Sequence, residues 1–148
     1  MRHANIYEEV QRESLEGREL EASVLFRAAQ KLNQCARDWE NGNTKEFHEK
    51  LTEALRFNQK VWSFLQVELG NPANPLPETL RLNLLRLSKF VDKEIFTLFA
   101  GGGTVEDLLS IARVNEQIGR GLQVKTTESP ADTEEEIHSA GSLLDIAG

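Results

Sequence analysis

Apolar side chains recur along this chain at spacings of three and four residues, the pattern of helices that each bury one face. Runs of β-branched residues are short and do not alternate with polar ones, so strands are not expected. The pattern predicts an all-α fold, a small bundle of about four main helices after a short N-terminal helix. The expected helices cover residues 4–14, 18–40, 45–69, 77–99 and 104–122.

Stop and start signals separate these helices. Gly17 is expected to end the short first helix, and Asn41-Gly42-Asn43 to end the second. Thr44 is a candidate N-cap for the third helix. Gly101-Gly102-Gly103 ends the fourth, and Thr104 to Asp107 opens the fifth in a pattern that resembles a capping box.

The third helix carries an asparagine in the middle of its apolar face. At 100° per residue its large apolar side chains fall within an arc of about 120°, with Asn58 at the centre. Phe57 and Phe64 lie together on one flank and widen the apolar surface. A helix at the edge of a bundle does not need so wide a face, which suggests a surface for a partner.

Asn58 therefore has two interpretations, and so does Asn115 in the fifth helix. A buried asparagine can pair inside the bundle and fix helix register, or it can meet the backbone of a partner in a groove. Internal pairing is favoured for Asn115, whereas the alternatives are balanced for Asn58. Trp62 is similar, because tryptophan is common both in cores and in interface hot spots.

The fourth helix is apolar on two sides. Its main stripe runs from Leu80 to Leu98, and a second stripe lies on nearly the opposite side, formed by Leu82, Leu85, Phe96 and Phe99. Such a helix is either enclosed in its own bundle or shared with a partner. A corner with prolines at 72, 75 and 77 precedes it and is expected to fix its angle to the third helix.

Length and composition indicate one cytoplasmic domain with an appended tail. The chain has 148 residues, a net charge of −7 and a single cysteine, Cys35, which cannot form an internal disulfide. No apolar run reaches the roughly 18 residues that span a membrane, and the N-terminus lacks the apolar core of a signal peptide. Residues 1–122 are expected to form the helical domain.

Residues 123–148 are expected to be a flexible acidic tail, with one lysine against six acidic residues. Within it, Ser142-Leu-Leu-Asp-Ile146 is either a frayed end or a short motif that docks on the domain's own groove. Basic residues elsewhere are interspersed with acids, so direct binding to nucleic acid is not expected. No partner in the membrane is expected either.

Catalytic and metal-binding patterns are missing from the sequence. The three histidines are far apart and make no zinc signature, and Cys35 lies on an apolar stripe, as an inert buried thiol would. Gly101 to Thr104 lacks the lysine and the preceding strand of a phosphate-binding loop. We therefore expect no enzyme, no metal, no cofactor and no small-molecule substrate.

Several of these residues together resemble the FlaF family of bacterial flagellar biosynthesis regulators. The resemblance rests on Asn58 before Val61-Trp62, on the corner Leu69-x-Asn71-Pro72-x-Asn74-x-Leu76-Pro77-x-x-Leu80-Arg81, and on Ile118-x-x-Gly121-Leu122. Tyr7 and the stretch Arg18 to Ala22 fit as well. It covers roughly residues 4–122 and leaves the acidic tail out.

The resemblance implies a helical cytoplasmic protein needed for flagellin production and export. FlaF-like proteins are expected to bind flagellin as secretion chaperones and to act with or against the regulator FlbT. Helical angles, rather than the family, suggest the partner-binding residues: Phe57, Asn58, Val61, Trp62, Phe64, Leu82, Leu85, Phe96 and Phe99. The alternatives are a post-transcriptional regulator that acts with FlbT on flagellin mRNA, and an adaptor at the export apparatus.

Overall fold

The computed structural model describes the backbone of residues 2–127 and the side chains of residues 17–40 and 42–123, and every regular element in this part of the chain is helical. The α-helices are α1 (Arg2–Arg37), α2 (Lys45–Gly70), α3 (Glu78–Phe99) and α4 (Val105–Thr127), with a 3-10 turn, η1 (Trp39–Asn41), after α1. The predicted all-α bundle is confirmed. Most of the predicted tail, residues 128–148, lies outside the described residues.

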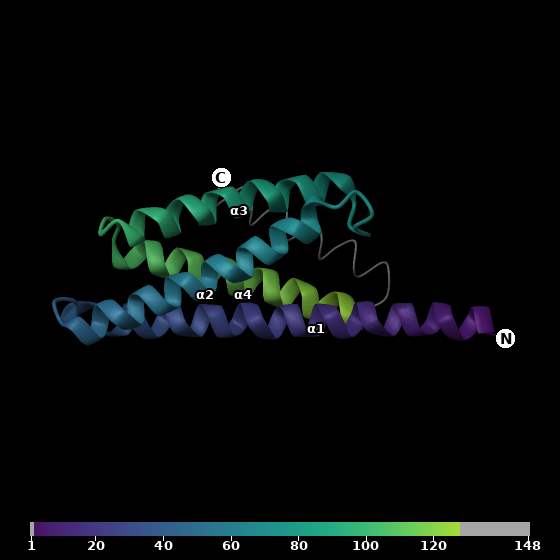
Figure 1. Ribbon diagram of the computed structural model, residues 1–148, viewed down its shortest axis with the longest axis horizontal. Helices are drawn as coiled ribbons and strands as arrows, with labels where there is room; N and C mark the ends of the chain where they lie inside the picture. The colour runs from purple at the N-terminus through teal and green to yellow at the C-terminus, as the bar shows by residue number, and fades with distance from the viewer. Residues whose placement is uncertain (1, 128–148) are drawn as a thin grey trace.

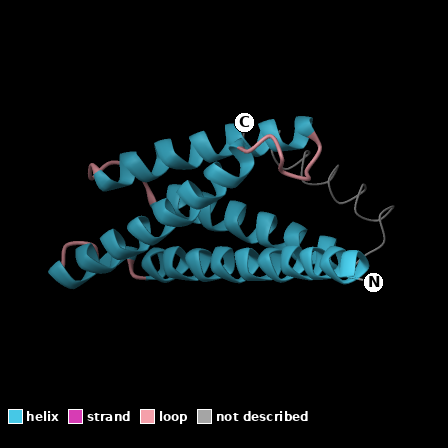
Figure 2. Cartoon of the chain, turned by 45° about the vertical axis from the view of Figure 1, so that its right-hand side comes forward, coloured by secondary structure: helices cyan, strands magenta, loops and turns pink. Residues whose placement is uncertain are grey.

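Among the described helices, α1 and α4 make the most extensive pair, packed side by side along the long axis of the molecule (Figure 1). The first turns of α1 extend beyond the ends of the other helices. α2 packs on both α1 and α3, and α3 lies on the opposite side of the bundle from α1 in both views (Figure 2). α3 touches α4 little, since the two helices meet at their connecting loop and diverge from there.

Gly17 does not end a helix, contrary to the prediction. The helices expected over residues 4–14 and 18–40 are one continuous helix, α1. A glycine costs a helix interior roughly 1 kcal/mol relative to alanine, and tertiary packing overrides a penalty of that size. This packing begins just after Gly17 in the sequence, because the side chains of Ala22, Leu25 and Ala28 are all fully buried.

The other start and stop signals act as expected. The Thr44 hydroxyl oxygen accepts a hydrogen bond from the Phe47 amide at 3.1 Å and caps α2. The Thr104 amide donates to the Asp107 carboxylate at 2.7 Å at the start of α4. Between α3 and α4, Gly101 and Gly103 have φ values of +86° and +82°, which a residue with a Cβ rarely adopts.

One apolar core joins the four helices. The predicted main stripe of α3 is buried at Leu80, Leu87, Val91, Ile95 and Leu98. The largest fully buried apolar side chains come from all four helices: Leu25, Leu32, Leu55, Trp62, Val91, Ile95, Leu108 and Ile111. α4 continues to Thr127, beyond the predicted end of the domain at residue 122.

The corner between α2 and α3 is held by side chains as well as by its prolines. Asn71 Oδ1 accepts from the Ala73 amide at 2.9 Å, and Asn74 Oδ1 accepts from the Leu76 amide at 3.0 Å. Asn74 Nδ2 and the Arg81 guanidinium donate to carbonyls in the last turn of α2, at 3.0 Å and 2.9 Å. The side chains thus satisfy backbone groups that the end of a helix leaves unpaired.

Replacing Gly17 by alanine should stabilise the protein by roughly 0.5–1 kcal/mol, because alanine restricts the unfolded chain and a Cβ here meets nothing within 4 Å. The matched change Gly103→Ala should destabilise, because its Cβ would lie 2.8 Å from Leu98 Cδ2 at a φ of +82°. Urea unfolding of both variants measures the two effects. A loss of stability in Gly17→Ala would contradict the unstrained helix through residue 17.

Candidate functional site

A chain of hydrogen bonds crosses the core of the bundle. Trp62 Nε1 donates to Asn115 Oδ1 at 2.8 Å, and Asn115 Nδ2 donates to Asn58 Oδ1 at 2.6 Å. Asn58 Nδ2 then donates to the Ala28 and Ala54 carbonyls at 3.2 Å and 2.8 Å. The indole N–H can only donate, so the Asn115 side chain must turn its oxygen toward Trp62. The Asn115 amide nitrogen then faces Asn58, which must in turn present its own oxygen.

Asn58 and Asn115 are therefore internal, which confirms their pairing inside the bundle. Asn58 is 0% exposed and Trp62 is 1% exposed, and the chain of hydrogen bonds ties α2 to both α1 and α4. The prediction that Asn58 and Trp62 belong to a partner-binding surface is wrong, because neither of these two side chains reaches the surface of the folded bundle. Helical angles placed them on the apolar face correctly but could not distinguish a face turned inward from one turned outward.

Other predicted partner-binding residues do lie on the surface. Phe64 is 60% exposed and Phe96 is 74% exposed, with Leu82 and Phe99 at 45% and 37%. Val67, on the same outer part of α2, is also exposed. We call Phe64, Val67, Leu82, Phe96 and Phe99 the outer apolar face.

The remaining predicted contacts are half-buried. Val61 and Leu85 pack against the core with part of their surface left open. Phe57 is partly covered from α1, where Arg27 Cζ and Lys31 Nζ lie 5.6 Å and 5.2 Å from its ring centroid. These three residues border the outer face, and their role in binding stays a prediction.

The second stripe of α3 lies along the edge that meets α2. Gln66 of α2 donates to the Ser88 hydroxyl at 3.2 Å and to the Asp92 carboxylate at 2.7 Å, which places the Asp92 edge of α3 against α2. Leu85 and Phe99 are seven residues before and after Asp92 and share its edge of the helix. Leu82 and Phe96 each lie three residues before these two, so they adjoin the same edge on the solvent side.

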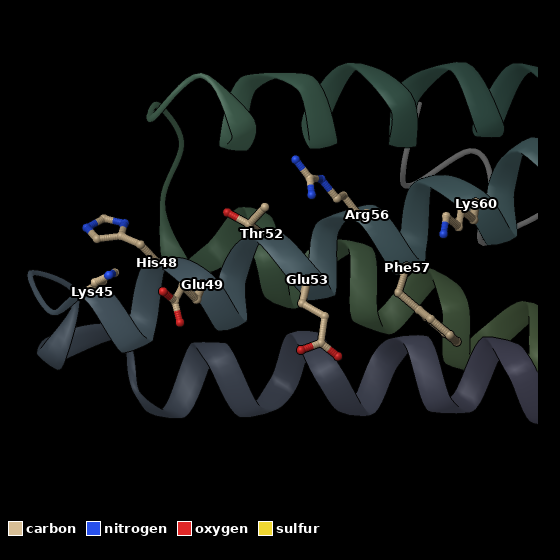
Figure 3. A pocket seen from close by; sticks show the side chains of 8 residues that line it. All are labelled: Lys45, His48, Glu49, Thr52, Glu53, Arg56, Phe57 and Lys60. Carbon is tan, nitrogen blue, oxygen red and sulfur yellow. The ribbon is translucent and has the colours of Figure 1, made fainter.

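A shallow hollow of about 590 Å³ lies over the outward side of α2, with α1 and α3 on either side of it (Figure 3). All of its lining side chains come from α2 at helical spacing: Lys45, His48, Glu49, Thr52, Glu53, Arg56, Phe57 and Lys60. Lys31 of α1 bridges to Glu53 at 3.0 Å. Since acids and bases alternate here, the hollow does not concentrate one sign of charge.

A deeper cleft of about 420 Å³ opens at the end of the bundle where α3 and α4 diverge. Its floor is apolar and is formed by Trp62, Leu65, Leu69, Leu84, Ile118 and Leu122. Gly17, Arg18 and Glu21 of α1 and Glu68 of α2 line it as well, and the corner Asn71 to Leu76 closes one side.

Glu21 and Glu68 both line this cleft, and their carboxyl groups lie close enough to interact. Burial, which is the largest cause, acts together with the neighbouring Glu68 carboxyl to raise the pKa of Glu21 to about 8, although the charge of Arg18 lowers it. Glu21 is thus protonated at neutral pH. Sequence inspection missed this pair, because the two residues lie on different helices and no local pattern indicates that they meet.

No group of histidine, cysteine, aspartate and glutamate within the described residues could hold a metal ion. Cys35 is buried, and this burial, together with the charge of Asp38, raises the pKa of its thiol, which disfavours a reactive thiolate. Among the helices described, none is long and apolar enough to cross a membrane.

Replacing Asn58 by leucine should destabilise the fold by about 2–4 kcal/mol, because Asn115 Nδ2 would lose its acceptor inside the core. Urea unfolding measures this loss. The neighbouring change Gln59→Leu, at an exposed position, is the control and should stay within about 0.5 kcal/mol of the parent. Equal stability of the two variants would contradict a structural role for the asparagine pair.

Stability should also fall as the pH rises from about 4.5 to about 8. The unfolded chain loses the Glu21 proton near 4.5, whereas the folded chain keeps it up to a pKa of about 8, so the folded state binds more protons in between. Glu21→Gln removes this difference and should flatten that part of the stability profile. Thermal unfolding across this pH range compares the two proteins, with Glu49→Gln, an exposed acid on α2, as the control. A profile of Glu21→Gln with the parent's slope would contradict the raised pKa of Glu21.

Comparison with known proteins gives one match. The sequence profile of the family described as flagellar protein FlaF matches residues 3–122, most of the chain and all but the last residues of α4. No curated protein and no solved structure matches the chain. The matched range contains the buried asparagine pair, the corner and the outer apolar face. This chain belongs to the FlaF family of flagellar proteins.

Proposed function

We propose that this chain is a flagellar biogenesis factor that binds flagellin in the cytoplasm as a secretion chaperone. The observation that carries the proposal is the exposure of large apolar side chains on α2 and α3, among which Phe64 and Phe96 are each more than half exposed. A soluble protein rarely exposes such side chains together unless they bind something. Membership of the FlaF family supports a flagellar client.

The arrangement of α2 and α3 suits an amphipathic helix as the client. The exposed stripe of α3 runs from Leu82 to Phe99 and borders the outward side of α2, so the two helices offer adjoining surfaces. A helix laid along such a surface anchors apolar residues at spacings of three and four. Unassembled flagellin is expected to present a helix of this kind.

The size of the outer apolar face favours binding that can be reversed. Burying one large apolar side chain contributes roughly 1.5–3 kcal/mol, and association loses several kcal/mol of translational and rotational freedom. A few exposed anchors at Phe64, Leu82 and Phe96 therefore suit moderate affinity. A chaperone that hands its client to an export apparatus needs such affinity.

The alternative is a post-transcriptional regulator that acts with FlbT on flagellin mRNA. Binding to RNA would need a strip of cations along the phosphate backbone. The hollow on α2 has Lys45, Arg56 and Lys60, but Glu49 and Glu53 lie among them (Figure 3). The mixture of charges favours a protein partner over a nucleic acid.

Replacing Phe96 by aspartate should weaken capture of flagellin at least tenfold, because the change puts a charge into the apolar contact. It should leave the stability of the protein nearly unchanged, since Phe96 is 74% exposed. Co-elution and calorimetric titration with purified flagellin measure the effect. Gln30→Asp, which adds the same charge at an exposed position of α1, is the control and should bind as the parent does.

Parallel titrations with FlbT and with flagellin mRNA distinguish the alternatives. Salt-tolerant binding to flagellin that is lost in Phe96→Asp supports the chaperone. Binding to the mRNA that falls steeply with salt, with no binding to flagellin, would overturn the chaperone in favour of the regulator. Unchanged flagellin affinity in Phe96→Asp would show that the client lies elsewhere.

A further inference from the structure

At the end of the bundle opposite the glycine loop, the described parts of the helices leave a corner open between them. α3 and α4 meet at Gly101 to Gly103 and diverge, so that the N-terminal half of α3 stands away from the C-terminal half of α4 (Figures 1 and 2). The cleft of about 420 Å³ lies between these two halves. None of its lining residues belongs to the outer apolar face.

The floor of this cleft is apolar surface that the described bundle does not cover. Leu76, Leu84, Ile118 and Leu122 pack against the core but keep part of their side chains open. They come from the corner, from α3 and from α4, so they lie on three sides of one opening. Apolar side chains of an incoming segment would take the place of the contact that α3 and α4 do not make.

The lining of the cleft also carries charged side chains from α1 and α2. Among the side chains that the structure describes, Arg18 is the cation that lines the cleft, and Glu21 and Glu68 are its acids. The Arg81 guanidinium of α3 is held by the Leu69 carbonyl at 2.9 Å, and Arg120 of α4 lies 3.9 Å from Glu116. Neither of these two arginines lines the cleft, so within residues 17–40 and 42–123 its charge comes from the two carboxyl groups and Arg18.

We propose that this cleft docks a short helical segment of another protein, one that inserts large apolar side chains and places a lysine or arginine against the Glu21 and Glu68 carboxyl groups. Charge balance supports the cation. Among the described side chains that line the cleft, the carboxyl groups of Glu21 and Glu68 face one arginine, Arg18. The pKa of Glu21 is raised there, so this carboxyl holds a proton while no further cation is present. A cation that binds at Glu21 takes the place of this proton, and the proton is released to the solvent.

The segment is helical because the cleft offers few partners for an extended backbone. The Ala73 and Leu76 amides of the corner already donate to the side chains of Asn71 and Asn74. The last carbonyls of α2 accept from Asn74 and Arg81. A segment that satisfies its own backbone as a helix needs only apolar contacts and one ion pair here.

The test uses the full-length protein and two synthetic helical peptides with blocked ends. Both peptides have leucines spaced three and four residues apart, and one position next to them is lysine in the first peptide and glutamine in the second. The lysine peptide should bind about tenfold more tightly at pH 8 than at pH 6, with release of a proton, because its binding competes with the proton on Glu21. Titration calorimetry in buffers of different ionisation enthalpy measures both quantities. The glutamine peptide should bind with little dependence on pH.

Variants assign this behaviour to the cleft. Glu21→Gln should keep the binding of both peptides and lose the pH dependence, whereas the control Glu49→Gln should behave as the parent does. Ile118→Ser should weaken both peptides, with circular dichroism as the check that the variant folds. Proton release that persists in Glu21→Gln would overturn the proposed role of the carboxyl pair. Lysine and glutamine peptides that bind equally at every pH would overturn it as well.

The chain's own terminus is the competing occupant. If neither peptide binds the parent, but both bind a full-length Leu143→Ser/Leu144→Ser variant, the segment Ser142 to Ile146 fills the cleft and the proposal of an external partner is wrong. If neither protein binds the peptides, the cleft is not a docking site. The peptide titrations contain no flagellin. They therefore test the cleft alone, and the titration with flagellin tests the proposed function alone.

Discussion

The bundle depends on a short chain of hydrogen bonds from Trp62 through Asn115 to Asn58 and the Ala28 carbonyl. It joins α1, α2 and α4 at one level of the core, and every amide orientation follows from the indole at one end. Apolar packing alone would let these helices slide past one another by a turn at small cost. A buried polar chain allows one register, because any other leaves a donor or an acceptor unpaired.

α3 stands outside this chain of hydrogen bonds. It is held by its apolar stripe, by Gln66 on Ser88 and Asp92, and by the corner that Asn71, Asn74 and Arg81 fix. Because only one side of α3 is buried, the opposite stripe stays exposed at Leu82 and Phe96. Because its N-terminal half diverges from α4, a cleft remains at the end of the bundle. The position of α3 thus contributes to both candidate docking surfaces.

The residues on which the family resemblance rests are largely structural. Asn58 and Trp62 fix the register of three helices, and Asn71, Asn74 and Arg81 end α2 and direct the chain into α3. The exposed Phe64 and Phe96 are not among them. Membership of the FlaF family therefore describes the scaffold, whereas Phe64 and Phe96 are side chains that this scaffold leaves at its surface.

Periodicity and capping residues were enough to predict the helices from Thr44 onward and the apolar stripes of α2 and α3, because these are local properties of the chain. They also predicted that Asn58 and Asn115 could pair, but angles on isolated helices could not say what lies opposite a face. Burial of Asn58 and Trp62, the continuity of α1 through Gly17, and the meeting of Glu21 with Glu68 all depend on which helices pack together. Contacts between residues far apart in sequence decide these features, and a local pattern carries no record of them.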